Sequence, residues 1–176
     1  MYKNTLFVIC MFFLLPAIGL TAGCTAKGRV VDAATGEPIE GASIAIRWIG
    51  HKIGPPYASG EYIAEEANAV SGDDGYFTVP KHYLKSCEMG VYKKGYVCWS
   101  NTSIFQKGLG DMGIDRIVDR VGFRIADGMV VELEPFTEEY PRPRHASFVR
   151  NISRSSGGLD GIGEEIQLYR RHYLNK

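Results

Sequence analysis

Hydrophobic and polar positions divide this chain into three regions of different character. Residues 6–15 are an uninterrupted apolar run that follows one basic residue, Lys3. From Lys27 onward, short stretches of alternating apolar and polar residues are separated by turns rich in Gly, Pro and Asp, which is typical of β-strands. Residues 159–176 place apolar side chains at helical spacing. The pattern therefore predicts a leader, a β domain and a terminal helix.

The clearest strand pattern lies between residues 27 and 80. Residues 27–32 and 76–80 are short strands beside turn residues, and residues 43–49 alternate between two faces. One face of this alternating strand carries Ile44, Ile46 and Trp48, and the other carries Ser43, Ala45 and Arg47. The alternation predicts a half-buried strand. Residues 62–70 contain Ala and Glu that suit a helix, but their neighbours favour a strand.

The later part of the β region is less regular. Residues 102–122 mix Gly, Asp and scattered apolar residues without a period, so a long loop is expected there. Residues 123–126 and 129–133 flank Asp127-Gly128, and Asp-Gly is a strong hairpin signal. The pattern predicts that these two segments form a closing hairpin, which Pro135 ends.

The chain after Pro135 is expected to be a polar linker followed by a helix. Residues 150–158 are polar and Gly-rich at their end, which predicts a flexible segment. In the helix over 159–176, one stripe contains Ile162, Ile166, Tyr169 and Tyr173. The expected organisation is a leader over 1–23, a β domain over 24–135, and a linker with an amphipathic helix over 136–176.

The leader ends in Leu20-Thr21-Ala22-Gly23-Cys24, which resembles the lipoprotein box of bacterial secretory signals. Small residues precede the cut, and an acyl chain would be attached to the Cys24 thiol. A membrane-spanning anchor needs about 20 apolar residues, and this run is shorter. A signal that is cleaved without lipidation is the competing interpretation, because Thr21 stands where the box usually carries Leu. The expected location is the bacterial cell envelope, held by lipid on Cys24, in the outer membrane of a diderm host since Thr25 is not Asp.

Charge and length limit the function classes. Removing residues 1–23 from the 176-residue chain leaves 153 residues, enough for one domain with a sizeable core. Lys3 is the leader's one charged residue, so the remainder carries 19 basic and 20 acidic residues. Such a balance offers no basic excess for nucleic-acid phosphates, and nucleic acid is not an expected partner.

Cys87 and Cys98 remain after the leader is removed. A turn at Lys93-Lys94-Gly95 would place Tyr92 opposite Tyr96 and Gly90 opposite Cys98. Cys87 lies three residues from Gly90, so it would point to the opposite sheet face from Cys98. Exported cysteine pairs usually form disulfides, whereas a bridge in this geometry would need a β-bulge or a different turn. Two alternatives therefore stay open: a Cys87–Cys98 disulfide, or two buried free thiols.

Three sequence blocks resemble the carboxypeptidase regulatory-like domain, a family similar in fold to transthyretin. The blocks are residues 28–44, residues 71–77 and residues 94–96. Their turn residues, which the resemblance places at fixed offsets, are Asp32, Thr35, Gly36, Pro38, Gly41, Asp74, Gly75 and Gly95. The resemblance covers residues 26–135 and implies an all-β, Greek-key-like β-sandwich of about seven strands. It further implies an accessory or binding module without catalytic activity.

Motifs for catalysis and metal binding do not appear. The histidines, at positions 51, 82, 145 and 172, show no metalloprotease spacing, and there is no G-x-S-x-G elbow or phosphate-binding loop. Asp73-Asp74-Gly75 supplies too few oxygens for calcium. A Cys–His nucleophile pair would meet only in space, so the sequence leaves a cryptic hydrolase open as the least favoured class.

The expected function is therefore binding or scaffolding in the envelope, with no cofactor and no metal. The membrane would be one partner, through Cys24, and an envelope protein or a glycan would be the other. Four aromatic residues could form a carbohydrate-stacking platform: Trp48, Trp99, Tyr57 and Tyr62. A glycan-binding module is therefore the second hypothesis.

Overall fold

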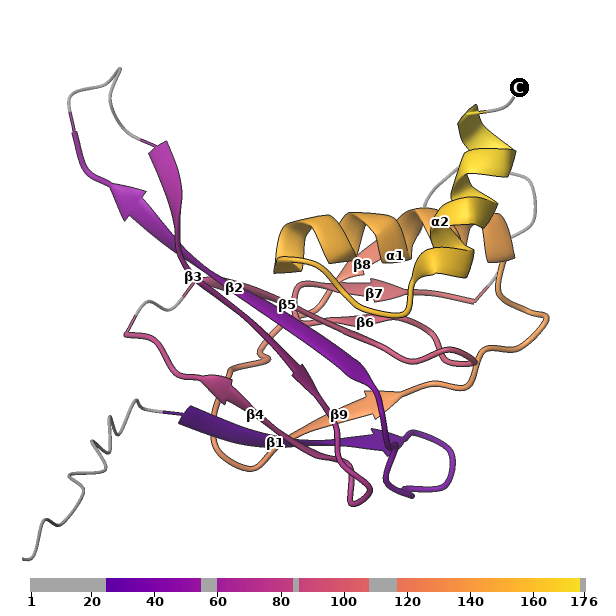
Figure 1. Ribbon diagram of the computed structural model, residues 1–176, viewed down its shortest axis with the longest axis horizontal. Helices are drawn as coiled ribbons and strands as arrows, with labels where there is room; N and C mark the ends of the chain where they lie inside the picture. The colour runs from indigo at the N-terminus through magenta and orange to yellow at the C-terminus, as the bar shows by residue number, and fades with distance from the viewer. Residues whose placement is uncertain (1–24, 55–59, 84–85, 108–116, 175–176) are drawn as a thin grey trace, which may run out of the picture.

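The computed structural model describes residues 25–54, 60–83, 86–107 and 117–174. The expected leader and Cys24 lie outside this part of the chain. The described residues are mostly β-strands in several sheets, followed by C-terminal helices (Figure 1). Among them, no helix is both long enough and apolar enough to cross a bilayer.

Two sheets face each other and form the first core. The smaller sheet has the order β4-β1-β9, with β1 at Thr25–Asp32, β4 at Tyr76–Pro80 and β9 at Met129–Leu133. The larger has the order β3-β2-β5-β6, and its strands are Ser43–Lys52 (β2), Gly60–Val70 (β3), Cys87–Tyr92 (β5) and Trp99–Ser100 (β6). Ile44, Ile46 and Trp48 of β2 are buried against Val30, Val79 and Val131 of the smaller sheet. The strand predicted over 62–70 is therefore confirmed, as are those over 27–32 and 76–80.

Helices cover the other face of the larger sheet, which makes a third layer (Figure 1). Helix α1 spans Arg142–Ser156, α2 spans Gly163–Tyr169, and a π-helical turn follows at Arg170–Leu174. Ala45 of β2 is fully buried beneath this layer, in a second core with Phe148, Val149 and Ile152 of α1. The prediction that β2 has one exposed face was therefore wrong along most of its length.

The polar linker predicted over 150–158 was also wrong, because α1 occupies most of it. The helix has Pro143 in its first turn and ends at Ser156, and the next residue, Gly157, has a φ of 104° in the left-handed region. Arginines stand at positions 142, 144, 150 and 154 of α1, and these charges hid its buried stripe. The stripe consists of His145, Phe148, Val149 and Ile152.

The terminal helix is shorter than the predicted 159–176. Leu159 is buried in the second core, and Gly161 adopts a φ of 75°, so α2 begins only at Gly163. Of the predicted stripe, Ile162, Ile166 and Tyr169 are half-buried, while Tyr173 is exposed. Arg150 of α1 lies 4.6 Å over the Tyr169 ring, so α2 packs on α1 within the same chain.

The hairpin predicted over 123–133 does not form. Strand β9 pairs in parallel with β1, with Gly28 opposite Met129. The Asp127-Gly128 turn is bonded to β1 instead, because Lys27 N donates to Asp127 Oδ1 at 3.0 Å and Gly128 N donates to Lys27 O at 2.9 Å. Residues 123–126 are not a strand; Phe123 and Ile125 pack against the first core.

Two further predictions need correction. The pairing of β5 with β6 is shifted by two residues, since Gly90 lies opposite Ser100 and not Cys98. The chain before β6 bonds elsewhere: Val97 N donates to Glu134 O at 2.8 Å. The loop predicted over 102–122 contains a two-stranded sheet of β7 (Ser103–Phe105) and β8 (Ile117–Asp119); residues 108–116 lie outside the described part.

Candidate functional site

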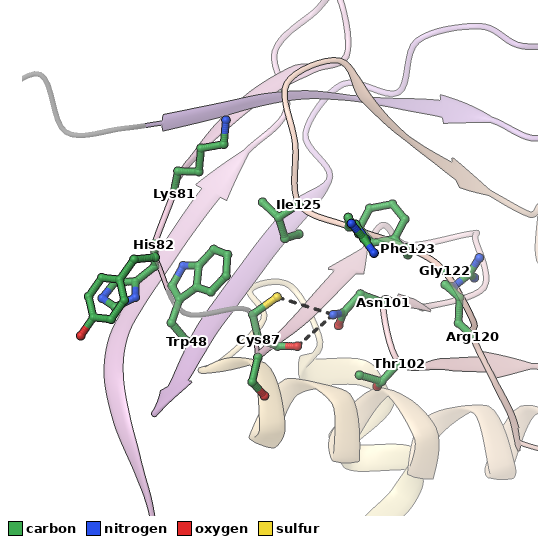
Figure 2. A pocket seen from close by; sticks show the side chains of 13 residues that line it. Trp48, Lys81, His82, Cys87, Asn101, Thr102, Arg120, Gly122, Phe123 and Ile125 are labelled. Carbon is green, nitrogen blue, oxygen red and sulfur yellow. Dashed lines mark hydrogen bonds between the residues drawn. The ribbon is translucent and has the colours of Figure 1, made fainter. Parts of the chain in front are cut away.

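An open cleft of about 820 Å³ lies at one end of the space between the smaller and the larger sheet (Figure 2). Its volume falls within the range of small-molecule sites. Its walls come from the far end of β2, the segment after β4, the start of β5, the turn after β6, and the segment before β9. The lining residues are Trp48, Lys81, His82, Tyr83, Ser86, Cys87, Asn101, Thr102, Arg120, Gly122, Phe123, Arg124 and Ile125.

Trp48 forms an aromatic wall of the cleft. Its side chain is 3% exposed, because the alternation of β2 directs it into the first core. The His82 ring stacks beside it, with centroids 6.0 Å apart and planes 29° apart. Within the described residues, the buried Trp48 Nε1 has no hydrogen-bond partner. An unmade buried hydrogen bond is costly, so this nitrogen is an unsatisfied donor behind the wall of the cleft.

Arg120 is the most enclosed cation of the cleft. Its Nε donates to Ser100 O at 2.8 Å, and its Cζ lies 4.7 Å over the Trp99 ring. Burial lowers the pKa of the Arg120 guanidinium, although arginine stays charged at any physiological pH. Because Nε is engaged, the two terminal nitrogens are the donors that remain, and a fork of this kind suits a carboxylate or phosphate.

Two more cations stand at the mouth of the cleft. Arg124 is exposed, and Lys81 Nζ lies 3.5 Å from Asp127 Oδ2. Within the described residues, neither Arg120 nor Arg124 forms an ion pair, and the described lining contains no carboxylate. The cleft is therefore positive, although the chain as a whole is neutral.

Cys87 lines the cleft but is a poor nucleophile. Burial, with a smaller contribution from the Glu88 charge, raises the pKa of the Cys87 thiol to about 11. Asn101 Nδ2 donates to Cys87 O at 2.9 Å and lies 3.7 Å from Cys87 Sγ, as Figure 2 shows. A nucleophilic cysteine needs a thiolate near neutral pH, and this environment favours the thiol.

Cys98 lies in the second core, on the other face of the larger sheet from Cys87. Both cysteines are free thiols, so of the two alternatives left open, the disulfide is not formed. Burial raises the pKa of Cys98, and its backbone amide donates to His145 Nε2 at 2.9 Å. Because Nε2 already accepts this bond, it cannot also take a proton from the thiol, and this Cys–His contact is structural.

The turn residues of the family resemblance form a hydrogen-bonded scaffold. Asp32 Oδ1 accepts from Ala34 N at 2.7 Å and Thr35 N at 3.0 Å, and Tyr96 Oη donates to Asp32 Oδ2 at 3.0 Å. Bonds from the Ala34 amide lower the pKa of Asp32 most. The blocks also meet each other, since Val30 N donates to Gly75 O at 2.9 Å.

The remaining turn residues have structural positions of the same kind. Pro38 makes a β-bridge with Val31, and Asp74 Oδ1 accepts from Tyr76 N at 3.0 Å. Positive φ angles occur at Gly36, Gly41, Gly75 and Gly95. None of these residues lines the cleft.

The aromatic platform expected for a glycan is not assembled among the described residues. Trp48 and Trp99 are 3% and 6% exposed, so neither presents an open ring face. Tyr62 lies on β3 with Lys52 Nζ 5.9 Å over its ring, and Tyr57 lies outside the described residues. No group of three or more potential metal ligands among His, Cys, Asp and Glu occurs in the described part of the chain.

Sequence reasoning identified Trp48 and Cys87 but missed the basic and aromatic residues around them. Lys81, His82, Arg120 and Phe123 belong to segments without a period, and they meet only because β9 folds back onto β1. The one available signal was the pair Arg120 and Arg124 flanking Gly122 in a stretch that no strand pattern explained.

Comparison with protein-family models and with curated proteins finds no match to this chain. Among solved structures, it is similar to the major plantain pollen allergen Pla l 1, with 15% sequence identity. The similarity covers 64% of this chain and 94% of the allergen chain, at a TM-score of 0.34. A value this low carries no conclusion on fold or function.

Proposed function

We propose that this protein is a non-catalytic, lipid-anchored protein of the bacterial envelope that binds a ligand in the cleft between its two sheets. The observation that carries the proposal is the composition of the cleft. Its described lining offers guanidinium groups without ion-pair partners, which suit an anionic ligand, and the raised pKa of its one thiol keeps that thiol protonated. Such a lining favours recognition over bond cleavage.

The finer fold assignment belongs to the same proposal. We infer a sandwich of the carboxypeptidase regulatory-like type, supported by the bonds that join its sequence blocks. Ser71 Oγ accepts from Ala42 N at 2.9 Å and donates to Ile39 O at 2.6 Å, which ties the second block to the first. In that family resemblance the domain is an accessory or binding module, consistent with the cleft.

Attachment through Cys24 places the domain directly on the membrane. The described chain starts in β1 at Thr25, the residue after Cys24, so no linker would separate lipid and sandwich. Covalent lipid supplies about 0.8 kcal/mol per buried CH₂, and stable anchoring takes more than one acyl chain.

The test of the anchor is Cys24→Ser, studied by lipid labelling and by fractionation with a high-salt wash. The parent should carry label and stay with the outer membrane, while the variant should carry none and be released. The wash contains high salt because salt screens charge–charge attraction to the membrane but does not remove a covalently attached acyl chain. A variant that keeps its label, or stays bound through the wash, would contradict the proposal.

A further inference from the structure

The cleft and the proposed anchor lie at the same end of the molecule. Thr25, the first residue of β1, pairs with Pro80, the last residue of β4. Lys81, His82 and Tyr83 follow Pro80 immediately and line the cleft. Figure 1 shows β1 beginning and β4 ending side by side. If lipid on Cys24 holds β1 against a bilayer, the mouth of the cleft lies at the lipid headgroups.

Side chains around the mouth fit that environment. Tyr83 is 82% exposed, and Val121, between Arg120 and Gly122, is 92% exposed. Both side chains are therefore free to enter an interfacial layer. Tyrosine is enriched at the headgroup level, where its ring is partly dry and its hydroxyl is wet.

The charge of the cleft selects an anion. The cleft is lined by three cations, Arg120, Arg124 and Lys81. Among the described residues, Asp127 forms an ion pair with Lys81, and the other two cations have no carboxylate partner. An enclosed guanidinium without an anionic partner is unfavourable, so Arg120 gains from a ligand that supplies one. The two terminal nitrogens left by its Nε–Ser100 bond match two oxygens of a phosphate ester.

We propose that the cleft binds the phosphate of an anionic phospholipid headgroup, in the membrane to which Cys24 attaches the domain. This inference rests on the proposed function and names its ligand. Arg120 holds the phosphate, Arg124 and Lys81 attract the anionic surface, and Tyr83 and Val121 enter the interfacial layer.

The experiment uses the full chain with Cys24→Ser, which removes covalent attachment from the measurement. The probes are vesicles of phosphatidylcholine alone, vesicles with one-fifth phosphatidylglycerol, and inorganic phosphate. Trp48 lines the cleft and Trp99 lies under Arg120, so tryptophan fluorescence reports binding alongside vesicle co-sedimentation. We expect binding to the anionic vesicles at least tenfold tighter than to neutral ones, with a change in fluorescence.

Variants locate the binding. Near an anionic surface each Lys or Arg contributes about 1 kcal/mol, so Arg124→Gln and Lys81→Gln should each weaken binding about fivefold. Arg120→Lys keeps the charge but loses the fork, and it should also weaken binding and reduce the fluorescence change. Arg171→Gln is the matched control, because it removes one exposed cation from the C-terminal turn, and it should leave binding unchanged.

Three results would overturn the inference. Equal binding to phosphatidylcholine vesicles, whose phosphate is neutralised by choline, and to anionic vesicles would exclude recognition of an anionic headgroup. Equal losses from Arg171→Gln and Arg124→Gln would show attraction by overall charge without a site. Fluorescence changes with inorganic phosphate but not with vesicles would assign the cleft to a free phosphate compound. None of these results bears on lipid labelling of Cys24, so the proposed anchor stands or fails separately.

Discussion

The backbone amide of Cys98 donates a hydrogen bond to Nε2 of His145 across 2.9 Å, and this bond joins the segment just before β6 to helix α1. His145 is 2% exposed, and the Phe105 and Phe136 rings lie 5.3 and 4.8 Å from its own ring. Burial, assisted by the Arg142 charge, lowers the pKa of His145 to about 4. The imidazole is therefore neutral in the folded protein at physiological pH.

This contact should make the protein sensitive to acid. Between about pH 6.5 and pH 4 the unfolded chain binds a proton at His145 that the folded chain does not, so stability falls as the pH falls through this window. The shift corresponds to roughly 3 kcal/mol at most. His145→Gln keeps an acceptor oxygen and cannot titrate. Denaturant unfolding at several pH values should show a flatter profile for the variant, and parallel profiles would contradict this role of His145.

Helix α1 approaches the sheet closely only because residue 90 is glycine. A Cβ at Gly90 would lie 2.6 Å from Ile152 Cγ2 and 3.0 Å from Ser156 Oγ. Gly90→Ala should therefore push α1 outward and destabilise the fold by about 1–3 kcal/mol. Gly163→Ala is the control, because nothing lies within 4 Å of its added Cβ and alanine favours a helix. Equal melting temperatures for the Gly90→Ala variant and the parent would show that α1 packs less tightly.

The turn at Gly75 should tolerate no side chain. Gly75 has a φ of 76°, and an added Cβ would lie 2.5 Å from Val30 O and 3.1 Å from Pro38 Cβ. Gly75→Val should cost about 1–3 kcal/mol through backbone strain, and contact with β1 adds to it. Gly60→Ala, where nothing lies within 4 Å, should leave the denaturant midpoint near that of the parent. A Gly75→Val midpoint within error of the parent would refute this role of the turn.

The turn chemistry and the strands of the first core could be predicted from sequence because their signals are local. Alternation in β2 identified Ile44, Ile46 and Trp48, and the Gly75 conformation follows from its neighbours. The parallel pairing of β9 with β1 has no local signal. An Asp-Gly turn is as compatible with a local hairpin as with the observed parallel pairing. The bond that joins it to β1 comes from Lys27, 100 residues away in the sequence.

Helix α1 and the cleft were missed for related reasons. The polar face predicted for β2 is covered because α1 supplies partners for it; Arg47 Nη1, for example, donates to Arg154 O at 3.1 Å. An alternating pattern shows which face of a strand is polar, but not whether another element covers that face. The face with Ser43, Ala45 and Arg47 was therefore predicted to be exposed. The cleft residues come from separate aperiodic segments, and only the folded sheet brings Arg120 to Trp99.

The C-terminal segment should stabilise the sandwich in cis. Leu159 is 5% exposed in the second core, and Asp160 N donates to Ser43 Oγ at 2.8 Å. Deleting residues 157–176 should lower the melting temperature and increase binding of a hydrophobic dye, because Tyr92 and Val149 lose their cover. An unchanged melting temperature, or rapid amide exchange throughout 159–174 in the intact protein, would show instead that this segment serves a partner.

Glu165 of α2 is a buried carboxylate with an incomplete set of partners. It is 6% exposed, its Oε1 lies 3.9 Å from Arg142 Nη2, and its Oε2 has no partner among the described residues. Burial raises the pKa of Glu165, and the Arg142 charge opposes this only in part. The folded chain therefore holds a proton here more readily than the unfolded chain does. Its contribution to stability is present at low pH and is lost as the pH rises through the folded-state pKa.

Glu165→Gln removes this charge while keeping the shape of the side chain. The variant should be more stable than the parent at pH 7 by about 0.5–2 kcal/mol, because a buried, half-satisfied charge is replaced by a neutral amide. The gain should shrink as the pH falls through the folded-state pKa of Glu165, where the parent carboxyl becomes neutral too. Since the pH dependence of His145 has the opposite sign, the measurement compares Glu165→Gln with the parent in a His145→Gln background. Glu164→Gln, on the exposed ion pair with Lys94, is the matched control and should gain nothing at pH 7. A loss of stability at pH 7 in Glu165→Gln would mean that the Arg142 ion pair outweighs the cost of burial.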